Sequence, residues 1–174
     1  MNIMHEPLFS AAAIRDRVAA IAAQINQDYA GRTLDVVSLC NGGWMFTADL
    51  LRLIEVPTRL HQLGFSSYGA PNVTGEVRLT LDIAEPLYQR DVLVIEGLII
   101  SGRTPRYVVE MLKLRGPASI ALCAVGVKRH MLAVELPIAY VAFELGDEQV
   151  IGYGIGAGPE KGLPFLALQR GEPK

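Results

Sequence analysis

Cysteine, histidine and long apolar runs are all scarce in this sequence. The chain of 174 residues contains two cysteines, Cys40 and Cys123, and both lie in apolar segments. We expect them to be reduced core residues, with catalytic or metal-binding use as the alternative. No apolar run approaches the roughly 20 residues that are needed to cross a bilayer. Residues 1–7 lack the basic start and apolar core of a signal peptide, so a cytoplasmic protein without a membrane anchor is expected.

Several kinds of site also lack their characteristic patterns. No serine stands in a G-x-S-x-G turn, and the three histidines, His5, His61 and His130, are scattered along the chain. No cluster of histidines, cysteines or carboxylates has metal-ligand spacing. His61 is more typical of a sheet residue than of a base, and a solvent-exposed basic turn is the default for Lys128, Arg129 and His130. The formal net charge of −2 gives no general electrostatic reason to bind nucleic acid.

What the sequence does contain is a high apolar fraction, 51%, in a chain long enough to bury a sizeable core. Strand-like and helix-like segments alternate, which indicates an α/β fold with a mainly parallel sheet covered on both faces. We expect a single domain over residues 1–174, with irregular structure from residue 152 onward. The predicted helices cover residues 11–30, 44–54 and 105–114; the predicted strands cover residues 34–40, 58–63, 76–81, 92–95, 120–125 and 140–143.

The stretch at residues 92–104, VLVIEGLIISGRT, stands at the centre of this pattern. Its apolar residues 92–95 are typical of a strand that is buried on both faces of a parallel sheet. Glu96 is expected to end that strand. Its carboxylate is either satisfied by local hydrogen bonds or placed to contact a ligand hydroxyl or an ion.

A helix is expected to begin at the end of this stretch. Thr104 is a good N-cap, and Pro105 suits the first helical position, where no amide donor is needed. The small residues Ser101 and Gly102 allow backbone amides to converge beside the helix start, which is a favourable place for an anion. A strand, turn and helix of this composition is also common without any ligand.

Two other polar turns are expected at the same edge of the sheet. One is formed by residues 41–43, and the other contains Lys128 and Arg129. Parallel sheets bind ligands outside the carboxyl ends of their strands. The three turns are therefore predicted to share one crevice.

The stretch 92–104 resembles the phosphoribosyl pyrophosphate signature of the type I phosphoribosyltransferases, in their hypoxanthine-guanine branch. Further landmarks hold in order and spacing from about residue 34 to residue 165. They are CNGG at residues 40–43, the pair Ser67 and Tyr68, VKR at residues 127–129 and VIGYG at residues 150–154. The resemblance implies a mainly parallel sheet flanked by helices, with a core at about residues 34–150, a small hood made from the termini, and a homodimer or homotetramer.

In that family, a ribose phosphate is transferred from phosphoribosyl pyrophosphate to a purine base, with magnesium. The resemblance assigns the 5′-phosphate to Ile100, Ser101, Gly102, Arg103 and Thr104, and the ribose hydroxyls to Glu96. It assigns pyrophosphate to Asn41, Gly42 and Gly43, the purine to Lys128, Gln149 and Val150, and closure of the site to the loop that contains Ser67 and Tyr68.

The departures from the family pattern fall where this chemistry takes place. Gly97 and Ile100 stand where acids are expected, and Gln149 replaces a ring-stacking aromatic residue. Gly156 replaces a magnesium-binding Asp, and Gly162 replaces an arginine that neutralises pyrophosphate. Isoleucine cannot exchange a proton, and glycine has no side chain to bind magnesium.

Two hypotheses follow from this combination. In the first, the protein binds a purine nucleotide or a related phosphorylated ligand with weak or lost catalysis, alone or paired with an active relative. In the second, it is an active purine phosphoribosyltransferase that makes IMP or GMP in purine salvage. Magnesium is expected as a cofactor only in the second case.

Overall fold

A computed structural model describes residues 5–40, 42–68 and 76–169 of the chain. Within them, the main sheet has the strand order β4-β3-β2-β5-β6-β7, and only the β3–β4 pair is antiparallel. Its strands are β2 (Leu34–Leu39), β3 (Thr58–Tyr68), β4 (Glu76–Leu81), β5 (Asp91–Ile99), β6 (Ser119–Val127) and β7 (Ile138–Glu144). The helices are α1 (Ala11–Asp28), α2 (Trp44–Leu51) and α3 (Arg103–Lys113), with 3-10 helices η1 (Arg129–Met131) and η2 (Pro159–Gly162). The predicted α/β fold with a mainly parallel sheet is confirmed.

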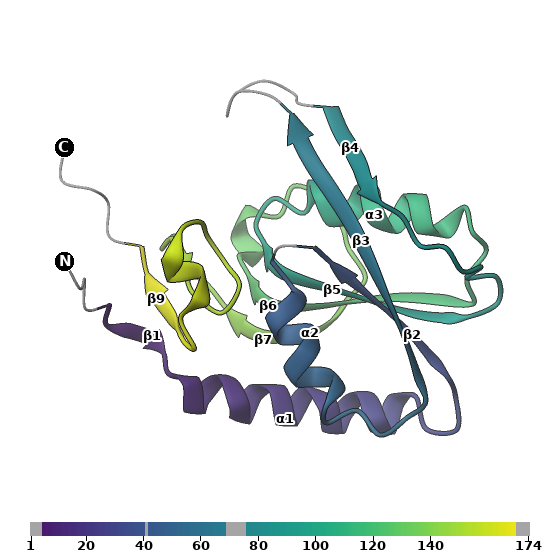
Figure 1. The fold of residues 1–174 in the computed structure, drawn as a ribbon, viewed down its shortest axis with the longest axis horizontal. Helices are drawn as coiled ribbons and strands as arrows, with labels where there is room; N and C mark the ends of the chain where they lie inside the picture. The colour runs from purple at the N-terminus through teal and green to yellow at the C-terminus, as the bar shows by residue number, and fades with distance from the viewer. Residues whose placement is uncertain (1–4, 41, 69–75, 170–174) are drawn as a thin grey trace.

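Helices α1 and α2 cover one face of the sheet, and α3 covers the other (Figure 1). Successive side chains of a strand point to opposite faces, so an apolar run in a central strand serves both layers. In β5, Leu93 and Ile95 pack with α1 and α2, whereas Val92 and Val94 pack with α3. All four side chains are fully buried, which makes β5 the centre of the core. Among the residues that the structure describes, no helix has the length and apolar character of a membrane span.

A small second sheet lies beside the main one and joins the two ends of the described chain (Figure 1). In it, β9 (Leu166–Leu168) pairs antiparallel with both β1 (Pro7–Phe9) and β8 (Val150–Ile151). The ring of Phe9 stacks on Phe143 of β7 with centroids 4.0 Å apart, which ties this sheet to the main one. Its action as a hood over a ligand stays a prediction.

Several boundaries differ from those predicted from the sequence, and three of these differences are the largest. Strand β5 continues beyond Glu96 to Ile99 because it pairs with β6 over that length. Strand β3 extends to Tyr68, inside the predicted loop, because it pairs with β4. The stretch from residue 152 is not wholly irregular, because it contains β9, in which Leu166 is fully buried.

The two cysteines have different environments, and both are free. Cys123 is fully buried in β6, and burial raises the pKa of its thiol. Cys40 follows β2 and is only partly buried, so its assignment to the core is wrong.

A buried ion cluster stabilises the end of the sheet where β2 begins. The carboxylate of Asp35 is fully buried, and its Oδ1 lies 2.7 Å from Nε2 of His61. Arg90 donates to the same oxygen at 3.1 Å, and Arg59 donates to Oδ2 at 3.3 Å. His61 is therefore a sheet residue bonded to a structural carboxylate, as its position in a strand predicted.

Replacing Asp35 with Asn should lower the free energy of unfolding by about 2–4 kcal/mol, because a fully buried carboxylate that holds Arg59, Arg90 and the buried His61 would lose its charge. Urea denaturation measures this loss. The matched control is Lys113→Ala, which removes an exposed ion pair with Glu110 and should cost less than about 1 kcal/mol. Similar losses in the two variants would contradict the structural role of the Asp35 cluster.

Candidate functional site

A cavity of about 390 Å³ opens at the carboxyl ends of β5 and β6. Ile100 follows β5 directly, Lys128 follows β6 directly, and both line the cavity. Gln149 and Val150, at the start of β8, line it from the small sheet. The structure thus brings these four sequence-predicted residues together, because the carboxyl ends of parallel strands lie at one edge of a sheet.

Apolar side chains that the sequence reasoning missed complete the walls of this cavity. They belong to Leu98, Met131 and Ile155. Leu98 lies in β5, and the alternation of that strand could have identified it had the strand been predicted to its full length. Met131 ends the three-residue helix η1 and Ile155 follows β8, and both segments are too short for a periodic signal.

The start of α3 lies next to this cavity, immediately after Ile100. The helix begins at Arg103, and its N-cap is Gly102, which has a φ of 77°. The prediction of Thr104 as N-cap is therefore wrong, since the left-handed conformation of Gly102 already turns the chain into the helix. The Arg103 amide donates to Oγ of Ser101 at 3.5 Å and Pro105 has no amide hydrogen, so the Thr104 amide is the donor at this helix start that is available to an anion.

This turn is held in place by the segment that follows η1. The amide of Ala133 donates a hydrogen bond to the carbonyl of Ser101 at 3.0 Å. A side-chain carbon at Gly102 would lie 2.9 Å from Leu136 and 3.1 Å from Val134. Glycine is favoured here chiefly by its left-handed backbone conformation, and a side-chain carbon would in addition require the ends of the Leu136 and Val134 side chains to shift.

Lys128 is buried, with 4% of its surface exposed. Its amide donates to the carbonyl of Ile99 at 2.9 Å, which fixes the backbone beside the end of β5, and Nζ donates to the carbonyl of Asp147 at 3.1 Å. The expectation of a solvent-exposed basic turn is therefore wrong for Lys128. It holds for its exposed neighbours Arg129 and His130, which pair with acidic residues of the surface.

Glu96 lies inside β5 and is partly buried. Its Oε1 accepts a hydrogen bond from the amide of the following Gly97 at 2.8 Å. Burial raises the pKa of Glu96 to about 7, and this hydrogen bond offsets only part of the shift. The local hydrogen bond expected from the sequence is present, and contact with a ligand hydroxyl stays a prediction.

The turn before α2 packs directly on this part of β5. A side-chain carbon at Gly97 would lie 2.5 Å from the carbonyl oxygen of Gly42, and one at Gly154 would lie 3.0 Å from the same oxygen. A side-chain carbon at Gly43 would lie 2.8 Å from the carbonyl oxygen of Ile95. Only glycine permits these approaches, and the sequence reasoning did not anticipate them.

The remaining predicted positions are only partly described. Asn41 lies outside the described residues. Ser67 and Tyr68 end β3, where their backbone pairs with Val77 and Glu76 of β4. The roles expected for these residues in pyrophosphate binding and closure stay predictions.

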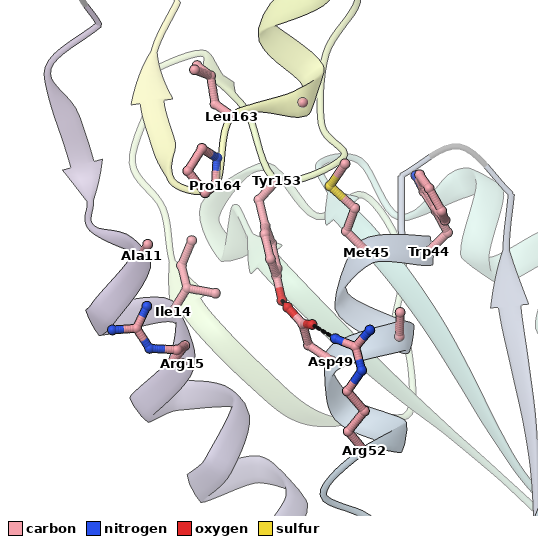
Figure 2. Close-up of a pocket in the computed structure, with 12 residues that line it drawn as sticks. Ala11, Ile14, Arg15, Trp44, Met45, Asp49, Arg52, Tyr153, Leu163 and Pro164 are labelled. Carbon is pink, nitrogen blue, oxygen red and sulfur yellow. Dashed lines mark hydrogen bonds and ion pairs between the residues drawn. The ribbon is translucent and has the colours of Figure 1, made fainter.

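A second cavity of about 390 Å³ lies between α1, α2 and the segment that follows β8 (Figure 2). Inside it, the carboxylate of Asp49 accepts a hydrogen bond from the Tyr153 hydroxyl at 2.7 Å and one from Arg52 at 2.8 Å. Gly162 lines this cavity rather than the one that contains Lys128. The position where the resemblance implies a pyrophosphate-binding arginine is thus separate from the Lys128 cavity.

The comparison with known proteins identifies the family. Residues 6–157 match the family model described as the phosphoribosyl transferase domain. The chain belongs to this family. It is 37% identical over 165 residues to the hypoxanthine phosphoribosyltransferase of Salmonella typhimurium, covering 92% of this chain and 93% of that protein. It is 34% identical over 167 residues to the hypoxanthine-guanine phosphoribosyltransferase of Dictyostelium discoideum, with the same coverage of 92% and 93%.

Solved structures of hypoxanthine phosphoribosyltransferases have the same fold as this chain. The hypoxanthine phosphoribosyltransferase of Trypanosoma cruzi in complex with the product IMP superposes with a TM-score of 0.89 at 31% identity, covering 98% of this chain and 97% of that one. The enzyme from Staphylococcus aureus superposes with a TM-score of 0.89 at 28% identity, covering 95% and 91%. The family and fold predicted from the sequence are confirmed.

The phosphoribosyl transferase resemblance implies magnesium, but the side chains present do not fit this ion. Magnesium is held by carboxylates together with substrate phosphates, and Gly97, Ile100 and Gly156 offer no side-chain oxygen. The carboxyl of Glu96 lies against the Gly42 turn and accepts the Gly97 amide, and that of Asp147 lies on the exposed rim with Oδ1 2.7 Å from Nε2 of His130. Across the described ranges, no group of three or more histidines, cysteines or acids could hold a metal ion.

Replacing Glu96 with Gln should raise the free energy of unfolding above a pH of about 7, because it removes a carboxyl that is costly to ionise in the folded protein. The pKa of about 7 in the folded protein lies above the ordinary value of 4.5, so the native carboxyl keeps a proton that the unfolded one loses. The stability of the unaltered protein should therefore fall as the pH rises through this window, by about 1–3 kcal/mol. Urea denaturation should find Glu96→Gln more stable than the unaltered protein at about pH 8 and nearly equal at about pH 5.

The matched control for this measurement is Glu135→Gln, because Glu135 is exposed. It should track the unaltered protein at both pH values. A stability difference for Glu96→Gln that did not change with pH would contradict the raised pKa.

Proposed function

We propose that this protein binds a purine nucleotide, or a related phosphorylated ligand, in the cavity lined by Ile100 and Lys128, and that phosphoribosyl transfer in this site is weak. The observation that supports this most directly is the composition of the site. The helix start after Ile100 and the buried ammonium of Lys128 suit an anion and a carbonyl oxygen. The neighbouring positions 97, 100 and 156 lack the acids that the reaction uses.

Each binding group would have a separate part in this proposal. The amides and side chains of Ile100, Ser101, Gly102, Arg103 and Thr104 would bind the phosphate, and Glu96 would bind ribose hydroxyls. Lys128 would donate to an oxygen on the base, with Gln149 and the Val150 backbone at its edge. Asn41, Gly42 and Gly43 would lie toward the pyrophosphate side, and the small sheet and the loop with Ser67 and Tyr68 would cover the ligand.

The proposal of weak transfer is based on the side chains at two positions. A general acid or base typically contributes about 10²- to 10⁴-fold to a rate, and Ile100 cannot supply that step. Loss of charge stabilisation for a departing pyrophosphate costs a comparable factor, and Gly162 offers no positive charge. The two losses together would leave a site that binds more effectively than it converts.

Purine phosphoribosyl transfer is the second candidate function. The similarity to hypoxanthine and hypoxanthine-guanine phosphoribosyltransferases over most of the chain favours it. In that case the protein would make IMP or GMP from phosphoribosyl pyrophosphate and hypoxanthine or guanine, with magnesium bound chiefly by the substrate. Both candidates include a cytoplasmic homodimer or homotetramer, and the first also allows pairing with an active relative.

Replacing Thr104 with Glu should separate ligand binding from stability. An acid in the first turn of a helix stabilises the helix by about 0.3–1 kcal/mol, so the melting temperature should be unchanged or slightly higher. Its charge would repel a phosphate held by the same amides, and calorimetric titration should find IMP bound at least about tenfold more weakly.

The control for this variant is Thr104→Gln, which has nearly the same size without the charge. It should keep most of the affinity for IMP. Equal affinity of the Thr104→Glu variant and the unaltered protein would remove the phosphate site from the start of α3.

A turnover assay separates the two candidate functions. Purified protein is given magnesium, phosphoribosyl pyrophosphate and hypoxanthine, guanine or xanthine, and nucleotide formation is followed. Binding of IMP or GMP with turnover far below an ordinary enzyme rate of about 10 s⁻¹ is the expected result. Turnover near that rate would establish the second candidate in place of the first.

A further inference from the structure

The pyrophosphate side of the site is occupied by the protein's own backbone. The carbonyl oxygen of Gly42 lies so close to Gly97 and Gly154 that a side-chain carbon at either position would be within 3.0 Å of it. An acid at Gly97 and this position of Gly42 are therefore mutually exclusive. The group that faces β5 here is a carbonyl oxygen, which attracts neither a phosphate nor a proton acceptor.

The carboxyl group that remains on this side is also occupied. Oε1 of Glu96 accepts the Gly97 amide at 2.8 Å, and a side-chain carbon at Gly42 would lie 3.2 Å from it. The carboxyl thus lies between β5 and the glycine turn. Binding a divalent cation would require the carboxyl to carry a full negative charge in a partly buried position, which costs free energy that the cation would have to offset.

The other side of the site, formed by Lys128 and the start of α3, supplies hydrogen-bond donors instead of acceptors. Lys128 is buried, and Nζ donates to one acceptor within the described residues, the carbonyl of Asp147, although an ammonium has three donors. The Thr104 amide at the start of α3 is also a donor without a helical partner. These groups need acceptor atoms, such as the oxygens of one phosphate and of a base, and they supply their positive charge without a metal.

We propose that the site holds a nucleoside monophosphate without magnesium, and that it binds this ligand in preference to a ribose phosphate that carries a pyrophosphate. This inference rests on the proposed function, because it specifies the ligand of the same cavity. The phosphate and the base are held by the protein's own donors. A pyrophosphate would bring additional negative charge toward the Gly42 carbonyl, which repels it. Gly162 offers no cation there, which leaves the neighbouring Lys161 alone to balance that charge.

Calorimetric titration of the purified protein with IMP and GMP tests the proposal, with magnesium chloride in one set and EDTA in the other. The two dissociation constants for each nucleotide should agree within about twofold, since the charge-assisted hydrogen bonds all come from the protein. Phosphoribosyl pyrophosphate with magnesium should bind at least about tenfold more weakly than GMP, which corresponds to one missing charged contact.

A single substitution should create the metal dependence that the unaltered site lacks. Ile100 is 40% exposed at the edge of the cavity, so Ile100→Asp can be accommodated without the steric conflict found at Gly97. In EDTA this variant should bind GMP about tenfold more weakly because of like-charge repulsion, and magnesium should restore part of the affinity. The control Leu114→Asp adds the same charge at a position that is 89% exposed, beyond the end of α3, and should behave as the unaltered protein.

The possible outcomes distinguish this inference from the proposed function. Nucleotide binding that requires magnesium, or tighter binding of phosphoribosyl pyrophosphate than of GMP, would overturn the inference and leave the proposed function standing. Absence of nucleotide binding under both conditions would overturn both. Equal, metal-independent binding of IMP or GMP with weak binding of phosphoribosyl pyrophosphate would support it.

Discussion

The close approach of Gly42 to Gly97 is the constraint on which the arrangement of the site depends. The Gly42 carbonyl can lie against β5 only because neither Gly97 nor Gly154 has a side chain. In this position it covers the Glu96 carboxyl, which is bonded to the Gly97 amide and keeps its proton up to a pH of about 7. The absence of an acid at position 97 and the packing of the Gly42 turn on β5 therefore depend on each other. Supplying the acid alone would not recreate a metal site, because the turn would have to move first.

The parallel sheet explains why the ligand-binding groups nevertheless converge. Strands β5 and β6 run side by side, so the residues that follow them, Ile100 and Lys128, arrive at the same edge. The amide of Lys128 bonds to the carbonyl of Ile99 and continues this pairing one residue past the end of β6. At the other end of the sheet, the Asp35 cluster fixes the start of β2. The Asp35 cluster and the cavity proposed for the ligand thus lie at opposite ends of the sheet, and the cavity lies at the carboxyl ends, where parallel sheets usually bind ligands.

Sequence patterns predicted the sheet, the helices and the convergence of Ile100 and Lys128 on one cavity because these depend on local and periodic signals. The run at residues 92–95 has the composition of a strand buried on both faces, and the structure buries all four side chains. Features that depend on distant pairing were not accessible in this way. Strand β9 exists because it pairs with β1 and β8, and the burial of Lys128 depends on how β6 ends beside β5.

The start of α3 illustrates a different limit of sequence reasoning. Thr104 and Pro105 suit an N-cap and a first helical residue, but Gly102 adopts a left-handed conformation and starts the helix earlier. Glycine tolerates several conformations, so its presence alone does not reveal which one the chain takes. The contact between Gly42 and Gly97 is hidden for the same reason, because a close backbone approach between distant segments has no periodic signature.

The residues that match the phosphoribosyl transferase family differ in how strongly they indicate a ligand. Gly102 is favoured by the fold itself, since its φ of 77° lies in the left-handed region that other residues rarely adopt. Its presence would be expected even if the site bound nothing. Lys128 is different, because burying an ammonium costs stability unless its donors find acceptors, and one carbonyl satisfies only part of that need. Packing alone would favour an apolar residue at this position. The buried lysine is therefore the strongest structural argument that this cavity receives a ligand oxygen.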